Sequence, residues 1–139
     1  MSYTKSKNIL IVDDDEDLTN LFQTFLEYDG YKVDAFPDPI DALNSFKKNT
    51  YDLSLLDLKM PRMCGIKLSQ KLKNIDPTLL FRFITAHKEY IERLKKNKPD
   101  IEKIVIYKPI WLNELRTKVH SLLSDDQQKE DKDNLLMLI

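Results

Sequence analysis

Short apolar runs alternate along the chain with longer segments in which apolar residues recur every three or four positions. Ile9 to Val12 is one uninterrupted apolar run, and Leu53 to Leu56 is another, broken by a single serine. Runs of this length are typical of strands buried inside a parallel sheet. One further segment, 32–36, alternates between apolar and polar residues. Five strands are predicted, at 8–12, 32–36, 53–56, 79–84 and 101–107.

Helices are predicted between the strands, because apolar residues recur there with a period near that of an α-helix. Asp29-Gly30 has the form of a helix C-cap, and Asp38 followed by Pro39 marks the start of the next helix. The charge-rich segment 88–98 is a short fourth helix. The inward stripes of the other four helices are Leu18, Leu21, Phe22 and Phe25, then Ile40, Leu43 and Phe46, then Leu68, Leu72 and Ile75, and finally Trp111, Leu115, Val119 and Leu122.

Five strand–helix units in succession predict an α/β domain with a parallel sheet covered by helices on both faces. The 139 residues suffice for one such domain. From about residue 124 the composition changes, because 124–134 is polar and charged and 135–139 is apolar. We therefore expect a domain over 1–123 and a separate segment over 124–139. That segment is interpreted as an unstructured tail, a docking segment for an apolar groove, or the start of a linker.

The composition of the chain argues against several classes of function. Lys and Arg number 22 against 23 Asp and Glu, so the net charge of -1 provides no overall field for nucleic acid or an anionic membrane. A single cysteine excludes an internal disulfide, and two glycines argue against a Gly-rich phosphate loop. We find no secretory signal and no apolar run long enough to span a bilayer, so we expect a cytoplasmic location and no membrane partner.

Aspartates follow two of the predicted strands directly. Asp13 and Asp14 come after the first strand, and Asp57 comes after the third. The carboxyl ends of parallel strands lie along one edge of a sheet, where open α/β sheets bind their ligands. Clustered carboxylates repel one another unless a cation or a proton joins them. Their oxygen atoms suit a hard cation such as Mg²⁺ better than zinc, so the pattern predicts a magnesium site.

Two further strand ends carry complementary chemistry. Thr85 ends the fourth predicted strand, and Lys108, followed by Pro109, ends the fifth. The lysine can pair with a phosphoryl group as a point charge, and the threonine can donate a hydroxyl hydrogen bond to the same group. A carboxylate can act as the nucleophile in phosphoryl transfer, whose catalysis is mostly positioning and charge neutralisation. The set therefore favours an aspartyl phosphate on Asp57.

The order Asp-Asp, then Asp, then Thr, then Lys-Pro resembles the receiver domain of two-component response regulators over about residues 8–123. Each motif is weak by itself, but all of them in order at matching spacing are specific. The resemblance implies a flavodoxin-like, doubly wound sheet of five parallel strands in the order 2-1-3-4-5, with five helices. The matching segments are Ile9-Leu10-Ile11-Val12-Asp13-Asp14-Asp15, residues 51–61, Ile84-Thr85-Ala86 and Lys108-Pro109.

By this resemblance Asp57 is the phosphoacceptor. Asp14 and Asp57 would bind Mg²⁺ directly, Asp13 would bind it mainly through water, and the backbone carbonyl of Lys59 would add a ligand. The donor would be a histidine kinase or a histidine phosphotransfer protein. Such a domain catalyses its own phosphorylation and dephosphorylation and turns over no small-molecule substrate, so we do not expect an enzyme. No output domain follows within the chain, which implies a stand-alone receiver or one that lacks its output domain.

The resemblance also implies that Thr85 and Lys108 contact the phosphoryl oxygens and report phosphorylation to the surface. Family members usually carry an aromatic residue three positions before this lysine. Here that position is Val105, and strand alternation predicts that Tyr107 points the opposite way from Lys108. A valine cannot make the same exposed-to-buried swing, so a shift led by Thr85 must suffice. Cys64 stands where the family often has Asp, and a thiol is a poor helix N-cap; we interpret it as a small buried filler.

Residues 88–123 correspond to the usual signalling face of the family and would bind a downstream protein. The predicted helix at 88–98 is basic, which favours an acidic partner surface. We expect no nucleic-acid contact, because no stacking aromatic pattern accompanies the charges. Lys59 and His87 occupy positions that tune phosphoryl-group lifetime in the family, although His87 is equally consistent with a solvated loop residue. His120 is expected at the surface.

Three alternative interpretations were weighed. Residues 13–17 superficially match a haloacid-dehalogenase-type phosphatase, but Asp17 stands at the Thr/Val position of that motif and no cap domain fits into the chain. An EF-hand loop fails, because Leu18 stands where Gly is needed and Thr24 where Glu is needed. A phosphate-independent pseudo-receiver stays open because of Val105. Asp15 is interpreted as the residue that starts the first helix.

Overall fold

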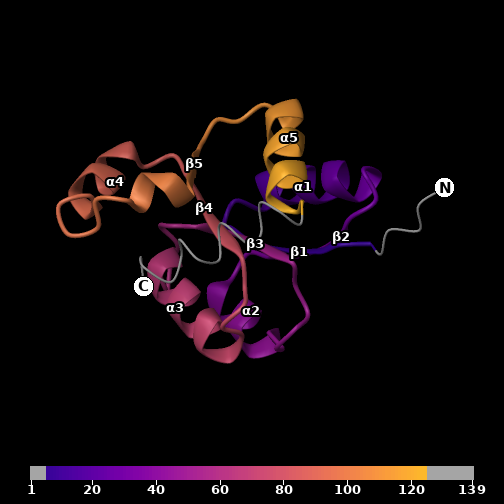
Figure 1. The fold of residues 1–139 in the computed structure, drawn as a ribbon, viewed down its shortest axis with the longest axis horizontal. Coiled ribbons are helices and arrows are strands. Elements are labelled where there is room, and N and C mark those ends of the chain that lie inside the picture. Colours follow the sequence, from indigo (N-terminus) through magenta and orange to yellow (C-terminus); the bar gives the residue numbers. More distant parts are fainter. Residues whose placement is uncertain (1–5, 125–139) are drawn as a thin grey trace.

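The structure is a computed structural model that describes residues 6–124, so all of the segment expected over 124–139 except Ser124 lies outside the described residues. Strands and helices alternate along the chain as predicted (Figure 1). The elements are β1 (Asn8–Val12), α1 (Glu16–Tyr28), β2 (Lys32–Phe36), α2 (Pro39–Ser45), β3 (Leu53–Asp57), α3 (Gly65–Ile75), β4 (Phe81–Thr85), α4 (Lys88–Leu94), the 3₁₀ helix η1 (Ile101–Ile104), β5 (Val105–Tyr107) and α5 (Leu112–Leu122).

The five strands form one parallel sheet in the order β2-β1-β3-β4-β5, which confirms the predicted fold class. Helices α1 and α5 lie on one side of the sheet, and α2 and α3 lie on the other (Figure 1). The register pairs Val12 with Leu56, Asp57 with Ile84, and Thr85 with Tyr107. The carboxyl ends of β1, β3, β4 and β5 are therefore level with one another, which brings the residues that follow them to one edge.

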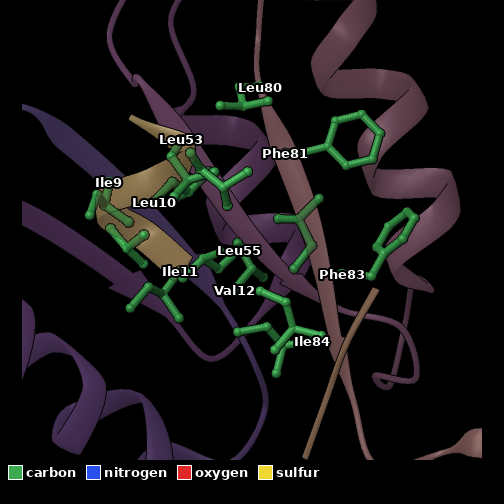
Figure 2. Packing of buried hydrophobic residues seen from close by; sticks show 14 of the residues in the cluster. Ile9, Leu10, Ile11, Val12, Leu53, Leu55, Leu80, Phe81, Phe83 and Ile84 are labelled. Carbon is green, nitrogen blue, oxygen red and sulfur yellow. The ribbon is translucent and has the colours of Figure 1, made fainter. Parts of the chain in front are cut away.

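The core lies on both faces of the central strands. Every residue of β3 and β4 is buried, as are the last four residues of β1. Helices cover both faces, so these strands carry apolar residues almost continuously. Phe81 and Phe83 project from the same side of β4 (Figure 2), and their ring centroids lie 5.3 Å apart in an edge-to-face arrangement. Within residues 6–124, no helix has the length and apolar character needed to cross a membrane.

The predicted fifth strand, 101–107, is partly wrong, because only Val105–Tyr107 is a strand and Ile101–Ile104 is a 3₁₀ helix. The amide of Lys103 donates to the carbonyl of Asp100 (3.0 Å), which closes a tight turn. Ile101 and Ile104 are both buried at a spacing of three residues, which is the 3₁₀ period. A short apolar run does not distinguish this period from a strand. The fourth helix also ends earlier than predicted, at Leu94, and turns follow it as far as residue 98.

The helix starts mostly follow the predicted capping chemistry. The Asp15 side chain accepts a hydrogen bond from the amide of Leu18 (3.1 Å), which confirms its role at the start of α1. The Asp38 side chain accepts from the amide of Ile40 (2.8 Å) in the same way. Cys64 is the N-cap of α3 and makes no side-chain capping bond, as expected of a thiol. It is half-buried, however, and not the buried filler that was expected.

Three residues predicted to point inward are exposed instead. Ile75 is 38% exposed at the last position of α3. Leu21 is 49% exposed, because α1 turns a stripe of Thr19, Phe22 and Leu26 toward the sheet and leaves Leu21 outside it. Trp111 is 77% exposed, because it precedes the first turn of α5 as the N-cap and does not belong to the helical stripe. Ile75 and Trp111 lie at helix boundaries, where side chains no longer follow the period of the helix, whereas Leu21 lies inside α1 and beside its buried stripe.

Candidate functional site

The predicted acidic cluster forms at the carboxyl edge of the sheet. Asp13 and Asp14 follow β1 directly, and Asp57 is the last residue of β3. One carboxylate oxygen from each of the three lies within 4.8 Å of the others. Asp13 and Asp57 are buried, whereas Asp14 is exposed. The cluster therefore has two charges inside the protein and one at its mouth, and it is open to solvent on the side of Asp14.

Lys108 reaches the same cluster from the end of β5. Its Nζ lies 2.6 Å from Oδ2 of Asp13 and 4.0 Å from Oδ2 of Asp57. Its backbone amide donates to the carbonyl of Thr85 (2.8 Å), which fixes where the side chain begins. One ammonium group thus faces three carboxylates, and it pairs most closely with Asp13. The cluster keeps an excess of negative charge that a cation or a proton must offset.

The electrostatics of the site act most strongly on Asp57. The pKa of Asp57 is raised to about 7, chiefly by burial and next by the neighbouring charge of Asp13; Lys108 opposes this shift, and a hydrogen bond with Asp14 and the charge of Asp14 add to it. The donor atoms are all oxygens, which are the ligands that a hard divalent cation prefers. Such an ion would replace the proton by relieving the repulsion among the carboxylates. The residues present therefore fit a cation of the Mg²⁺ type.

Thr85 is fully buried at the end of β4. Its hydroxyl oxygen accepts a hydrogen bond from the amide of His87 (3.0 Å), so its hydrogen remains available to a group at the cluster. This bond ties Thr85 to the loop that leads into α4. His87 lies in that loop, directly before α4, and lines a surface cleft together with Lys59.

Lys59 lies two residues beyond Asp57, in the loop that leads to α3. Its side chain extends toward α4, where Nζ lies 5.4 Å from the centroid of the Tyr90 ring. The side chain of Lys59 therefore lies beside α4, while its backbone belongs to the loop that follows Asp57. Only the carbonyl is a predicted metal ligand.

Gly65 is a site residue whose importance the sequence did not reveal. A Cβ atom at this position would lie 2.2 Å from the backbone oxygen of Asp57 and 3.0 Å from the Cα of Leu58. The amide of Gly65 donates to the carbonyl of Leu58 (2.8 Å), which holds the start of α3 against the end of β3. Only glycine permits this approach. The available signal was the rarity of glycine in the chain, with one of its two glycines at a predicted helix start.

A second contact missed by sequence reasoning holds the same loop. Arg62 has a left-handed backbone conformation, with φ of 75°, and its guanidinium pairs with the carboxylate of Asp38 at the start of α2. Two contacts therefore hold the loop between Asp57 and α3: Arg62 pairs with Asp38 at the start of α2, and Gly65 bonds to Leu58 next to the end of β3. No short sequence pattern links positions 38 and 62.

The position usually occupied by the switch aromatic holds a half-buried valine, Val105. The Tyr107 hydroxyl donates to Oε1 of Glu102 (3.4 Å), and Nζ of Lys88 lies 5.6 Å from the centroid of its ring. Lys108 extends instead to Asp13. The two neighbouring side chains therefore point in different directions, as strand alternation predicts.

Comparison with known proteins gives a consistent result. The family model described as the response regulator receiver domain matches residues 9–120. The chain is 32% identical to the response regulator receiver protein CpdR of Brucella abortus, over 84% of this chain and 97% of that protein. It is 30% identical to the transcriptional regulatory protein RprY of Bacteroides fragilis, over 91% of this chain and 53% of that protein. The chain thus spans about half the length of RprY and nearly all of CpdR.

Solved structures show the same fold. A receiver domain protein described as CheY-like, from Methanospirillum hungatei, has a TM-score of 0.73 at 26% identity, over 91% of this chain and 99% of that one. The non-phosphorylated HemR receiver domain of Leptospira biflexa has a TM-score of 0.73 at 30% identity, over 86% and 95%. TrrA of Thermotoga maritima, solved in complex with Mg²⁺ and BeF, has a TM-score of 0.69 at 28% identity, over 84% and 99%.

Proposed function

This chain belongs to the response regulator receiver domain family of two-component systems, and we propose that it relays a signal by accepting a phosphoryl group on Asp57. The observation that supports this most directly is the convergence of Asp57 with Asp13, Asp14 and Lys108 at one edge of the sheet. A nucleophilic carboxylate, a cation-binding pair and a fixed ammonium are the groups that phosphoryl transfer to an aspartate requires.

Magnesium is the proposed cofactor. The carboxylates of Asp14 and Asp57 and the backbone carbonyl of Lys59 would hold it directly, with Asp13 acting mainly through water. When bound, Mg²⁺ neutralises the carboxylates and draws the oxygens of an incoming phosphoryl group toward them. The excess negative charge and the raised pKa of Asp57 give this cluster a physical reason to bind a divalent ion.

Besides the metal, the transfer requires a phosphoryl donor and the residues of this chain. We propose that the donor is a phosphohistidine on a histidine kinase or phosphotransfer protein. An oxygen of the Asp57 carboxylate attacks phosphorus, so that an O–P bond forms while the P–N bond breaks. The electron pair of that bond stays on the imidazole nitrogen, which takes up a proton. Lys108 turns from Asp13 toward the phosphoryl oxygens, and the Thr85 hydroxyl donates to one of them.

Loss of the phosphoryl group follows the same geometry. Water attacks phosphorus and releases a proton, the O–P bond to Asp57 breaks with its electrons returning to the carboxylate, and inorganic phosphate leaves. We propose that the domain catalyses these two reactions on itself and turns over no small-molecule substrate. Lys59 and His87, which flank the site, are proposed to set how readily water reaches phosphorus.

The signal would leave the domain through residues 88–123. Thr85 is bonded to the amide of His87, so a shift of Thr85 toward a phosphoryl group would pull on the loop before α4. Val105 has no ring to swing, so this loop would carry the change by shifting an existing equilibrium between two arrangements. A downstream protein that binds this face would then recognise one arrangement better than the other.

The test is phosphorylation by acetyl phosphate with Mg²⁺, followed by intact-mass measurement. One phosphoryl group is expected on the wild-type chain, and none after Asp57→Asn or after addition of EDTA. Asp100→Asn removes an exposed carboxylate elsewhere and should leave the modification unchanged. A wild-type chain that stays unmodified would contradict the proposal and favour a phosphate-independent pseudo-receiver. Hydrolysis of phosphate esters that survives Asp57→Asn but not Asp13→Asn would favour a phosphatase.

A further inference from the structure

A cleft of about 360 Å³ opens between the loop after β3 and the first turns of α4. In Figure 1, α4 lies at the end of the fold nearest β4 and β5, and the side chains of Lys59, Lys88 and Arg93 are exposed. The cleft is lined by residues from both elements and lies next to the phosphoacceptor, because Lys59 is two residues from Asp57. The lining residues are Lys59, Ala86, His87, Lys88, Glu89, Tyr90 and Arg93.

The lining is basic, with Lys59, Lys88 and Arg93 against a single acid, Glu89. Among the described residues, no carboxylate lies within ion-pairing distance of any of these three cations. Within residues 6–124, these three cations are therefore not paired with a carboxylate. The cleft adjoins a cluster of the opposite sign, Asp13, Asp14 and Asp57, so a ligand that approaches this end of the sheet meets two adjacent fields of opposite sign.

The cations are positioned by aromatic rings. Nζ of Lys59 lies 5.4 Å from the centroid of Tyr90, and Cζ of Arg93 lies 5.8 Å from the same centroid. Nζ of Lys88 lies 5.6 Å from the centroid of Tyr107. A ring attracts a cation without consuming its N–H donors as a carboxylate would. Within the described residues, the three cations thus lie beside rings and form no ion pair with a carboxylate, which favours these positions before they bind an acceptor.

We infer that this cleft is a docking site for an acidic peptide segment of a partner protein. Carboxylates of the segment would pair with Lys59, Lys88 and Arg93, while the acidic cluster next to the cleft would repel the rest of the segment and fix its position. The chain as a whole has a net charge of -1, and the three cations are confined to one small cleft. A nucleic acid would need a basic tract that follows its backbone.

Docking here is expected to respond to phosphorylation, and in this respect the inference rests on the proposed function. Lys59 belongs to the loop that carries a proposed metal ligand. The amide of His87 is bonded to the hydroxyl of Thr85. A phosphoryl group that draws Thr85 inward would move one wall of the cleft relative to the other. The affinity of an acidic segment should therefore change with the state of Asp57.

The test uses a fluorescein-labelled hexaglutamate peptide as the probe and fluorescence anisotropy with the full chain at low ionic strength. Lys88→Glu with Arg93→Glu should weaken binding about tenfold or more. The matched control, Lys67→Glu with Lys71→Glu, makes the same charge change on exposed positions of α3 and should change affinity less than about threefold. Equal losses in both pairs would overturn the inference, because they would show attraction to overall charge alone.

A variant of Tyr90 tests the role of the ring. Tyr90→Leu preserves every charge but removes the ring beside Lys59 and Arg93, so it should weaken peptide binding several-fold. Unchanged peptide binding would contradict the role of the ring. A single-stranded DNA oligonucleotide that binds the cleft more tightly than the peptide would overturn the choice of an acidic peptide as the occupant.

Phosphorylation by acetyl phosphate is measured in the same samples. A chain that is phosphorylated but binds the peptide regardless of Lys88 and Arg93 loses only this inference, whereas an unphosphorylated chain that binds as expected loses only the proposed function.

Discussion

Lys108 pairs with Asp13 more closely than with Asp57, at 2.6 Å against 4.0 Å from Nζ to the respective Oδ2. Both carboxylates are buried, so the ammonium compensates the charge of Asp13 more closely than that of Asp57. Asp13 takes the ammonium, and Asp57 is left with a pKa raised to about 7, chiefly by burial and next by the charge of Asp13. The proposed nucleophile is thus the least compensated acid of the buried pair in the metal-free protein.

Removing the charge at position 13 should lower the pKa of Asp57. In Asp13→Asn, Lys108 loses its closest partner and Asp57 loses its nearest like charge, so the pKa of Asp57 should fall below 7. Titration of the side-chain carboxyl carbons by NMR in the presence of EDTA measures the change. Asp100→Asn, far from the cluster and exposed, should leave the pKa unaltered. A pKa that stays near 7 in Asp13→Asn would show that burial alone sets it.

The raised pKa of Asp57 also predicts an unusual dependence of stability on pH without metal. The pKa is near 7 in the folded chain and ~3.9 in the unfolded chain, so between these values the folded state holds the extra proton. Stability should therefore decrease as pH rises from about 4 to about 7, by on the order of a few kcal/mol. Urea unfolding in EDTA at pH 5.5 and pH 8 tests the sign. Asp57→Asn should remove most of the difference, and Mg²⁺ should raise stability at pH 8.

The two glycines should respond differently to alanine. Gly65→Ala would place a Cβ atom 2.2 Å from the Asp57 carbonyl oxygen, so the loop after β3 must shift. We expect slower phosphorylation by acetyl phosphate and a lower free energy of unfolding. Gly30→Ala has open space around it but keeps φ at 98°, so it should cost about 1 kcal/mol of stability and leave phosphorylation unchanged. Equal phosphorylation rates in the two variants would contradict the steric role of Gly65.

Asp76 should be a stability residue distant from the chemistry. It is buried at the end of α3, where its carboxylate accepts hydrogen bonds from the amide of Asn49 and from the amide and hydroxyl of Thr78. Burial by itself raises the pKa of Asp76, but these bonds outweigh it and hold the pKa below its usual value. Asp76→Ala should cost about 2 kcal/mol, measured by urea unfolding at pH 7. Asp100→Ala, at an exposed ion pair, should cost under ~0.5 kcal/mol.

The sign of the pH effect at Asp76 is opposite to that at Asp57. A carboxyl whose pKa is lower in the folded chain stabilises the fold above its unfolded pKa and loses this contribution as pH falls through its folded pKa. Asp76→Ala should therefore make the loss of stability below pH ~4 shallower than in the wild type. A loss of equal steepness in the variant would show that other carboxyls carry the acid sensitivity.

Cys64 offers a stabilising substitution. It occupies the N-cap of α3 with an extended backbone and no side-chain capping bond. Ser at this position can accept a hydrogen bond from an amide of the first turn, so Cys64→Ser should stabilise the fold by roughly 0.5–1 kcal/mol. Thermal unfolding measures the gain. Cys64→Ala, which offers no acceptor, serves as the control and should give no increase.

The sequence predicted the chemistry of the site because that chemistry is tied to strand ends. Asp13, Asp57, Thr85 and Lys108 each follow or end an apolar run, and parallel strands bring such positions to one edge. The sequence failed where a segment has the apolar pattern of one type of element but adopts the conformation of another. The 3₁₀ helix at Ile101–Ile104 has the apolar content of a strand, and Trp111 has the spacing of a helix that begins one residue later.

By itself, the sequence determined the succession of strands and helices, the parallel sheet, and the types of side chain that meet at its edge, because these depend on local periodicity and chain order. Only the tertiary structure decided that Lys108 pairs with Asp13, that Gly65 must lie against the Asp57 carbonyl, and that Lys59 and Arg93 both lie beside the ring of Tyr90. Each of these depends on a separation of a few ångströms between residues distant in sequence, and on burial from solvent. Both are set by packing and leave no trace in a short stretch of sequence.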